Sequence, residues 1–102
     1  MAWIDVLSRE VLARARRMEV EAGGAALLLY DLGGAVHATA AVCPHQAAWL
    51  IQGRVDGDTV ECPRHMGRFH IPTGVRLGGP VCSNLRVYRT RVESGRVLVE
   101  VA

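Results

Sequence analysis

The sequence from position 43 to position 65, CPHQAAWLIQGRVDGDTVECPRH, contains two short segments of the same kind. The first is Cys43-Pro44-His45 and the second is Cys62-Pro63-Arg64-His65, so each places a cysteine before a proline and shortly before a histidine. Thiolates and imidazoles are ligands that bind transition metals well, and two matched loops that carry both indicate a metal site. The candidate metal ligands are therefore Cys43, His45, Cys62 and His65.

The mixture of ligand types in each loop distinguishes between two kinds of metal site. A structural zinc site typically takes two cysteines from one segment and two histidines from another, whereas each loop here supplies one of each. That arrangement suits a two-iron cluster in which one iron takes both cysteines and the other takes both histidines. Two ferric ions, two sulfides and two thiolates sum to a neutral unit, which accepts an electron more readily than a cluster with four thiolates. A zinc-stabilised structural module is the alternative.

Outside the two loops, the chain is patterned as short strands separated by glycine turns. Helix signals are confined to the segment from Ser8 to Ala15, where Ser8 is a candidate N-cap. Two-residue turns are indicated at Gly33-Gly34, Asp56-Gly57 and Ser94-Gly95. Strands are predicted at Arg16–Glu21, Ala25–Leu32, Val36–Val42, Thr59–Cys62, Leu85–Val92 and Arg96–Val101. The pattern predicts an all-β domain, arranged as a small antiparallel barrel or sandwich.

Length and charge exclude several classes of function. The chain has 102 residues, with twelve basic residues that are all arginine, ten acidic residues and a net charge of +2. It is too short for a nucleotide-binding domain plus a substrate domain and has neither glycine-rich nucleotide motif, so a self-contained redox enzyme is not expected. The spread of the arginines, without an interleaved aromatic platform, argues against nucleic acid. No apolar run has the roughly 20 residues of a membrane span, and three cysteines do not form a disulfide framework, so a cytoplasmic protein is expected.

The two loops resemble those of Rieske-type [2Fe–2S] ferredoxins, above all the small ferredoxin components of bacterial aromatic-ring-hydroxylating dioxygenase systems. The resemblance implies one [2Fe–2S] cluster, with Cys43 and Cys62 on the inner iron and His45 and His65 on the solvent-facing iron. It also implies a single Rieske domain over residues 1–102, in which an antiparallel β-sandwich or barrel base carries an inserted cluster-binding subdomain at approximately 43–80. Further matching positions are Leu50, Gly53, Gly67, Phe69, Thr73-Gly74 and the proline loop at Gly79-Pro80.

Positions around the cluster loops favour a low reduction potential. High-potential Rieske proteins carry an extra cysteine in each loop, and the matching positions here are Ala48 and Arg64. Those proteins also place a serine and a tyrosine where they donate hydrogen bonds to the cluster sulfurs, and here the positions hold Gly67 and Phe69. Because such bonds stabilise the reduced cluster, their absence predicts a potential at the low end of the Rieske range, on the order of −150 mV.

The resemblance implies an electron carrier with no catalytic residues of its own. It would pass single electrons from an NAD(P)H-dependent flavin reductase to a terminal oxygenase in aromatic hydrocarbon catabolism. The alternative within the fold is the small Rieske-like subunit of an assimilatory nitrite reductase. A monomer is expected, because a single exposed cluster needs no second copy.

Three exposed-looking side chains near the loops are candidates for docking these partners, namely Arg64, Arg68 and Trp49. Cys82 is predicted to be a small buried hydrophobe rather than a ligand. His37 and His70 are predicted to be ordinary surface or turn residues.

Overall fold

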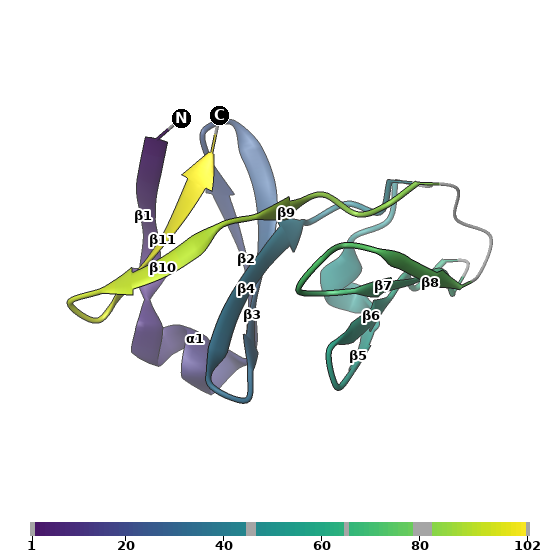
Figure 1. Ribbon diagram of the computed structural model, residues 1–102, viewed down its shortest axis with the longest axis horizontal. Helices are drawn as coiled ribbons and strands as arrows, with labels where there is room; N and C mark the ends of the chain where they lie inside the picture. The colour runs from purple at the N-terminus through teal and green to yellow at the C-terminus, as the bar shows by residue number, and fades with distance from the viewer. Residues whose placement is uncertain (1, 45–46, 65, 79–82, 102) are drawn as a thin grey trace.

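The structure, a computed structural model, describes residues 2–44, 47–64, 66–78 and 83–101. In these ranges the chain forms three antiparallel sheets, one short α-helix and one 3-10 turn. Figure 1 shows two halves side by side: a base that holds both termini, and a smaller half, here called the loop half, that carries the two cysteine loops. The base comprises residues 2–40 and 83–101, and the loop half comprises the described residues from 41 to 78. The predicted antiparallel, mostly β architecture is confirmed.

The base consists of two sheets around one apolar core. The first sheet has the order β1-β11-β10 and the second has the order β2-β3-β4-β9. Helix α1 (Arg9–Ala15) begins where the Ser8 hydroxyl accepts hydrogen bonds from the backbone N–H groups of Glu10 and Val11, as an N-cap does. The strands are β1 (Ala2–Ser8), β2 (Arg17–Ala22), β3 (Ala25–Leu32), β4 (Ala35–Ala40), β9 (Val87–Tyr88), β10 (Thr90–Glu93) and β11 (Arg96–Val101). The buried core residues are Leu7, Leu12, Ala22, Leu27, Leu29, Ala38, Val97, Val99 and Val101.

The loop half is a single four-stranded sheet with a core of its own. Its strands, in the order β5-β6-β7-β8, are three residues each and follow the 3-10 turn η1 (Leu50–Gln52). They are β5 (Arg54–Asp56), β6 (Thr59–Glu61), β7 (Arg68–His70) and β8 (Arg76–Gly78). The core beneath this sheet includes Leu28, Tyr30, Ala41, Cys43, Ala48, Leu50, Val60, Cys62, Phe69, Ile71 and Leu85.

Strand β3 contributes to both cores, which explains its apolar sequence from Ala25 to Tyr30. Successive side chains of a strand point to opposite faces. Leu27 and Leu29 accordingly lie in the core of the base, whereas Leu28 and Tyr30 lie in the core of the loop half. All four side chains are fully buried. The two cores therefore lie on opposite faces of β3.

One side-chain and one backbone hydrogen bond join the two halves. The Arg17 guanidinium donates to the Gly53 carbonyl at 2.8 Å, and the Leu85 N–H donates to the Gly74 carbonyl at 2.8 Å. Gly74 has φ +77°, and a Cβ atom there would lie 2.0 Å from the Leu85 carbonyl oxygen. Only glycine therefore allows the two backbone segments to approach this closely.

The strand predicted at Leu85–Val92 is wrong in one respect, because this segment forms two strands in different sheets. Tyr88 in β9 pairs with Ala38 of β4, whereas Thr90 in β10 pairs with Val99 of β11. Arg89 lies between them, where the chain passes from one sheet to the other. Strands β1, β5, β7 and β8 were not predicted. Among the described residues, no helix is long and apolar enough to cross a membrane.

Candidate metal centre

The two cysteine loops are closed by the same backbone hydrogen bond. The N–H of Cys43 donates to the Ala48 carbonyl at 3.0 Å, and the N–H of Cys62 donates to the Gly67 carbonyl at 2.8 Å. In both loops the acceptor lies five residues after the cysteine. The chain therefore reverses direction after each cysteine, and the backbone of each cysteine is held by the protein itself.

The second loop has an additional constraint at Met66. The Met66 N–H donates to the Cys62 carbonyl at 3.1 Å, and Met66 has φ +59°, in the left-handed region that is uncommon for residues other than glycine. The first loop instead closes with a β-bridge between Val42 and Trp49. The two loops thus share the hydrogen bond from the cysteine N–H. They differ in that the first closes with a β-bridge, whereas the second contains a residue with positive φ.

Both cysteines are buried in the core of the loop half. Cys43 is 3% exposed and Cys62 is 0% exposed, and among the described residues neither is joined in a disulfide. A buried thiolate without a compensating charge is costly, whereas a bound metal ion supplies that charge. Thiolates in such a setting are the donors that iron–sulfur clusters use. The two described ligand candidates, both buried in this core, therefore fit an iron–sulfur cluster.

The two histidine candidates, His45 and His65, lie outside the described residues. Within the described ranges, no group of three or more His, Cys, Asp or Glu side chains is arranged to hold a metal ion. The assignment of all four ligands therefore stays a prediction. Cys82 and the proline loop at Gly79-Pro80 also lie outside the described residues.

The aromatic residues beside the cysteines offer no hydroxyl to the loops. Phe69 is fully buried in β7 and has no donor. Tyr30 lies in the same core, but its hydroxyl is 2.8 Å from the hydroxyl of Thr39. The Thr39 hydroxyl donates to the Ala40 carbonyl, so Tyr30 is the donor in its bond to Thr39. Burial raises the pKa of Tyr30 to about 12, with smaller opposing effects from Thr39 and Arg17.

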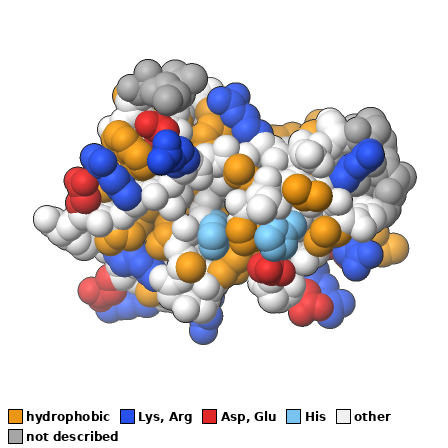
Figure 2. All heavy atoms as spheres, in the orientation of Figure 1, with side chains coloured by type: hydrophobic (Ala, Val, Ile, Leu, Met, Phe, Trp, Pro, Cys, Tyr) orange, Lys and Arg blue, Asp and Glu red, His pale blue; other side chains and the backbone are white. Residues whose placement is uncertain are grey.

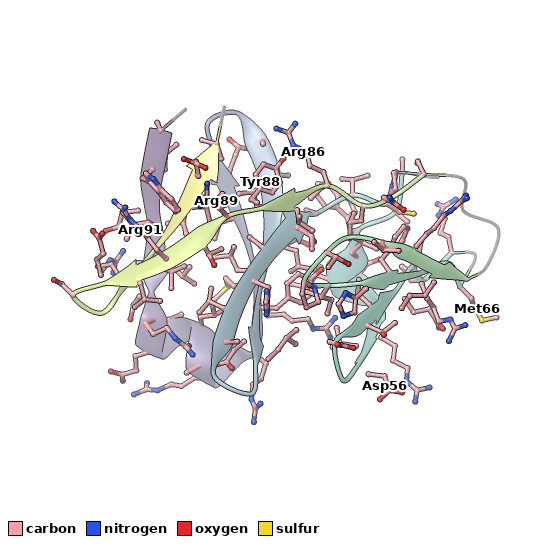
Figure 3. All side chains as sticks on the ribbon, viewed as in Figure 1. Asp56, Met66, Arg86, Tyr88, Arg89 and Arg91 are labelled. Carbon is pink, nitrogen blue, oxygen red and sulfur yellow. The ribbon has the colours of Figure 1, made fainter. Side chains whose placement is uncertain are left out.

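The surface near the loops contains three exposed apolar side chains, of which only Trp49 was predicted as a docking contact. Met66 is 64% exposed, Leu77 is 49% exposed and Trp49 is 45% exposed. Figure 3 shows Met66 projecting outward at the end of the loop half. The signal that could have identified Met66 is its position in the sequence, directly after the candidate ligand His65.

The two arginines predicted at a docking surface have different surroundings. Arg64 is exposed in the second loop. Arg68 is exposed in β7, where it pairs in register with Glu61 of β6, which in turn pairs with Arg54 of β5. Together with Asp56 and Thr59, these three residues line a surface hollow of about 240 Å³. Arg68 therefore belongs to a row of alternating charges on the outer face of the sheet.

The two other histidines lie outside the cysteine loops. Both ring nitrogens of His70 are in hydrogen-bond contact, with Nδ1 2.8 Å from the Thr73 hydroxyl and Nε2 2.9 Å from an Asp58 carboxylate oxygen. His37 lies in β4, and its pKa is lowered chiefly by partial burial and also by the charge of His70.

Figure 2 shows basic and acidic side chains distributed over both halves, without one dominant charged face in that view.

A family model for the Rieske [2Fe–2S] domain matches residues 2–89. The chain belongs to the Rieske [2Fe–2S] domain family. It is 34% identical over 100 residues to the ferredoxin component of the naphthalene 1,2-dioxygenase system of Pseudomonas aeruginosa, a match that covers 98% of this chain and 96% of that protein. It is 32% identical over 101 residues to the ferredoxin component of biphenyl 2,3-dioxygenase of Rhodococcus jostii (strain RHA1), covering 99% and 94% of the two chains.

Solved structures share the fold over nearly the whole chain. A ferredoxin from Sphingomonas yanoikuyae B1 superimposes with a TM-score of 0.87 at 27% identity, covering 99% of this chain and all of that chain. A chain from the complex of reduced oxygenase and oxidized ferredoxin in carbazole 1,9a-dioxygenase has a TM-score of 0.87 at 34% identity, covering 95% and 91% of the two chains. The predicted Rieske fold and [2Fe–2S] cofactor are confirmed, and the zinc alternative is no longer favoured.

Proposed function

We propose that this chain is the ferredoxin component of an aromatic-ring-hydroxylating dioxygenase system and carries single electrons to the terminal oxygenase. The observation that carries the proposal is the end-to-end match with ferredoxin components of such systems. The match covers almost all of both chains, so the similarity extends over the whole of those carriers. The nitrite reductase alternative has no comparable support among these relatives.

We assign the cluster ligands as Cys43 and Cys62 on one iron and His45 and His65 on the other. When bound, the cluster accepts and releases one electron at a time. The protein contributes two buried thiolates on backbone that is already held by hydrogen bonds, so little rearrangement is needed when the electron moves. Purified protein should be red-brown and contain iron and acid-labile sulfide. Zinc without sulfide would contradict the assignment.

We propose a low midpoint potential, on the order of −150 mV. The proposal rests on Gly67 and Phe69, whose side chains have no donor to offer the cluster sulfurs, and on Tyr30, whose hydroxyl donates to Thr39. A redox titration of the purified protein followed by the EPR signal of the reduced cluster measures the potential. A midpoint well above zero would contradict the proposal and would indicate a donor that the sequence does not reveal.

We propose that the electron comes from an NAD(P)H-dependent flavin reductase, and that the carrier works in the cytoplasm because its reductant is generated there. The docking surface for both partners lies near Arg64, Arg68 and Trp49, with Met66 as a further apolar contact. The support is the exposure of all four side chains in or close to the two loops. Exposed arginines chiefly raise the association rate with an acidic partner.

The docking surface is tested by charge reversal at the loop. Arg64→Glu should lower the rate of electron transfer to the oxygenase by roughly tenfold at low ionic strength, and salt should weaken the effect. Arg14→Glu, an equal charge change on the exposed face of α1, is the matched control, since the Arg14 side chain is 77% exposed. Equal rates for the two variants would exclude a docking role for Arg64.

The function itself is tested by substitution in reconstituted systems. The chain replaces the ferredoxin component in assays with the reductase and oxygenase of the naphthalene, 2,4-dinitrotoluene and biphenyl dioxygenase systems, whose ferredoxins are its relatives. NADH-dependent oxidation of the aromatic substrate in at least one system is the expected result. Failure in all three with an intact cluster would contradict the proposed function.

A further inference from the structure

Three arginines follow one another along the segment that contains β9 and β10, at positions 86, 89 and 91, and are called here the arginine row. Figure 3 shows Arg86, Arg89 and Arg91 spaced along this segment, with Tyr88 between the first two. The side chain of Arg89 is 81% exposed and that of Arg91 is 46% exposed, and Arg86 is also exposed. The row lies on the base, which contains neither of the two cysteine loops.

Two of these guanidinium groups are stacked on aromatic rings. The Arg86 guanidinium carbon lies 5.0 Å from the centroid of the Tyr88 ring, and that of Arg91 lies 4.4 Å from the Trp3 ring. Tyr88 itself packs against the core of the base, so the ring beneath Arg86 is held in place. A stacked guanidinium keeps its planar set of N–H donors available, and less rotamer freedom is lost when a carboxylate binds.

The carboxylates near the row neutralise it only in part. Arg89 is 3.9 Å from Glu100, close to the limit of an ion pair, and Arg91 is 2.9 Å from Glu93 in a pair in which both side chains are exposed. Within the described part of the chain, Arg86 has no carboxylate within ion-pair distance. An ion pair exposed on both sides, such as Arg91–Glu93, contributes little free energy, so a partner's carboxylate can replace it at small cost.

The row begins directly beside the loop half. Arg86 follows Leu85, whose N–H donates to Gly74 in the loop half, and the Arg86 carbonyl accepts from the Ala40 N–H at 2.8 Å. A standard protein interface covers about 800 Å² of each partner. That is roughly one seventh of the 5570 Å² surface of this chain, whose long axis is 40 Å, so such an interface would extend beyond the cysteine loops.

We propose that the arginine row is a second docking surface, which binds carboxylates on the acceptor oxygenase while the cysteine loops face its electron-accepting centre. The inference rests on the proposed function. Arginine suits this role because its planar donors match the two oxygens of a carboxylate. Two separated contacts would fix the rotation of the carrier on the oxygenase, which a single contact at the loops leaves open.

The test compares Arg89→Glu with Arg14→Glu in the oxygenase system that the wild-type chain reduces fastest. The two arginines are matched, because their side chains are 81% and 77% exposed and each lies near one glutamate. The second-order rate constant for electron transfer to the oxygenase is measured by stopped flow over a range of ionic strength. Arg89→Glu should lower it by about three- to tenfold at low salt, whereas Arg14→Glu should change it by less than about twofold.

Two further measurements separate a docking role from damage to the cluster. Arg86→Gln, which removes the charge and the stacking on Tyr88, should lower the same rate constant while the midpoint potential and the iron content stay unchanged. Equal rate constants for the Arg89 and Arg14 variants would overturn the inference, and so would a loss confined to electron uptake from the reductase. If the wild-type chain reduces no oxygenase at all, the proposed function fails instead.

Discussion

The base and the loop half are both antiparallel sheets, but their cores differ in what fills them. The base has strands of up to eight residues and a core whose buried side chains are all aliphatic. The strands of the loop half have three residues each, and their core includes Cys43 and Cys62. The core of the base therefore contains no candidate ligand, whereas the core of the loop half contains two.

This difference indicates that the two halves depend on the cluster to different extents. Binding of a group only to the folded state stabilises that state by mass action. Because the thiolates lie in the loop half, that stabilisation acts first on β5 to β8 and on the two loops. The base should remain ordered when the cluster is absent, since its own core does not contain a ligand.

The largest expected effect is the loss of the cluster in Cys62→Ser, in which a thiolate ligand is removed from the buried site. Iron and acid-labile sulfide should fall to background. Amide hydrogen exchange should then accelerate in the loop half, while β3 and β11 keep their protection. The matched control is Cys82→Ser, because Cys82 is predicted to be no ligand, and it should retain the full iron content. Retention of the cluster in Cys62→Ser would contradict the ligand assignment.

The next effect comes from two neighbouring leucines that face different cores. Leu29→Ala opens a cavity in the base and should lower the free energy of unfolding by about 2–5 kcal/mol. Leu28→Ala opens a similar cavity beside the cysteines, so it should also speed loss of the cluster on heating. Thermal unfolding followed by circular dichroism, together with the visible absorbance of the cluster, measures both. Equal rates of cluster loss in the two variants would mean that the halves unfold as one unit.

The smallest effect concerns His37 in the base. Its folded-state pKa is lowered by partial burial and by His70 from the usual value of 6.5, so the unfolded chain binds more protons below that pH. The folded state favours the neutral imidazole. Its contribution to the stability of the folded protein is fully present above about pH 6.5 and is lost as the pH falls through the folded-state pKa. Urea unfolding between pH 7 and pH 5 measures this slope. His37→Gln should flatten it, and an unchanged slope would exclude His37 as the cause.

Much of the base could be predicted because its patterns are local. The strand predicted at Ala25–Leu32 and the glycines that follow it correspond to β3 and its hairpin, and the strand predicted at Arg96–Val101 is β11. Ser8 correctly marked the start of α1. Each of these signals depends on residues within a few positions of one another, so the sequence alone carries them.

The short strands of the loop half could not be predicted in the same way. Three residues are too few to show an alternation, and β5, β7 and β8 are strands because neighbours pair with them. The boundary between β9 and β10 at Arg89 is also set by pairing. β9 pairs with β4 and β10 pairs with β11, and no turn signal in the sequence separates them. Tertiary contacts therefore decided these boundaries.

The class of protein was determined by the sequence, which also predicts the ligand set, because the choice of metal group depends on the types of donor and their spacing. The environment of those ligands was decided by the tertiary structure. It places Cys43 and Cys62 in one buried core, closes both loops with the same hydrogen bond and directs the hydroxyl of Tyr30 to Thr39. Donor chemistry belongs to individual residues, whereas burial and hydrogen-bond partners arise only when distant segments meet.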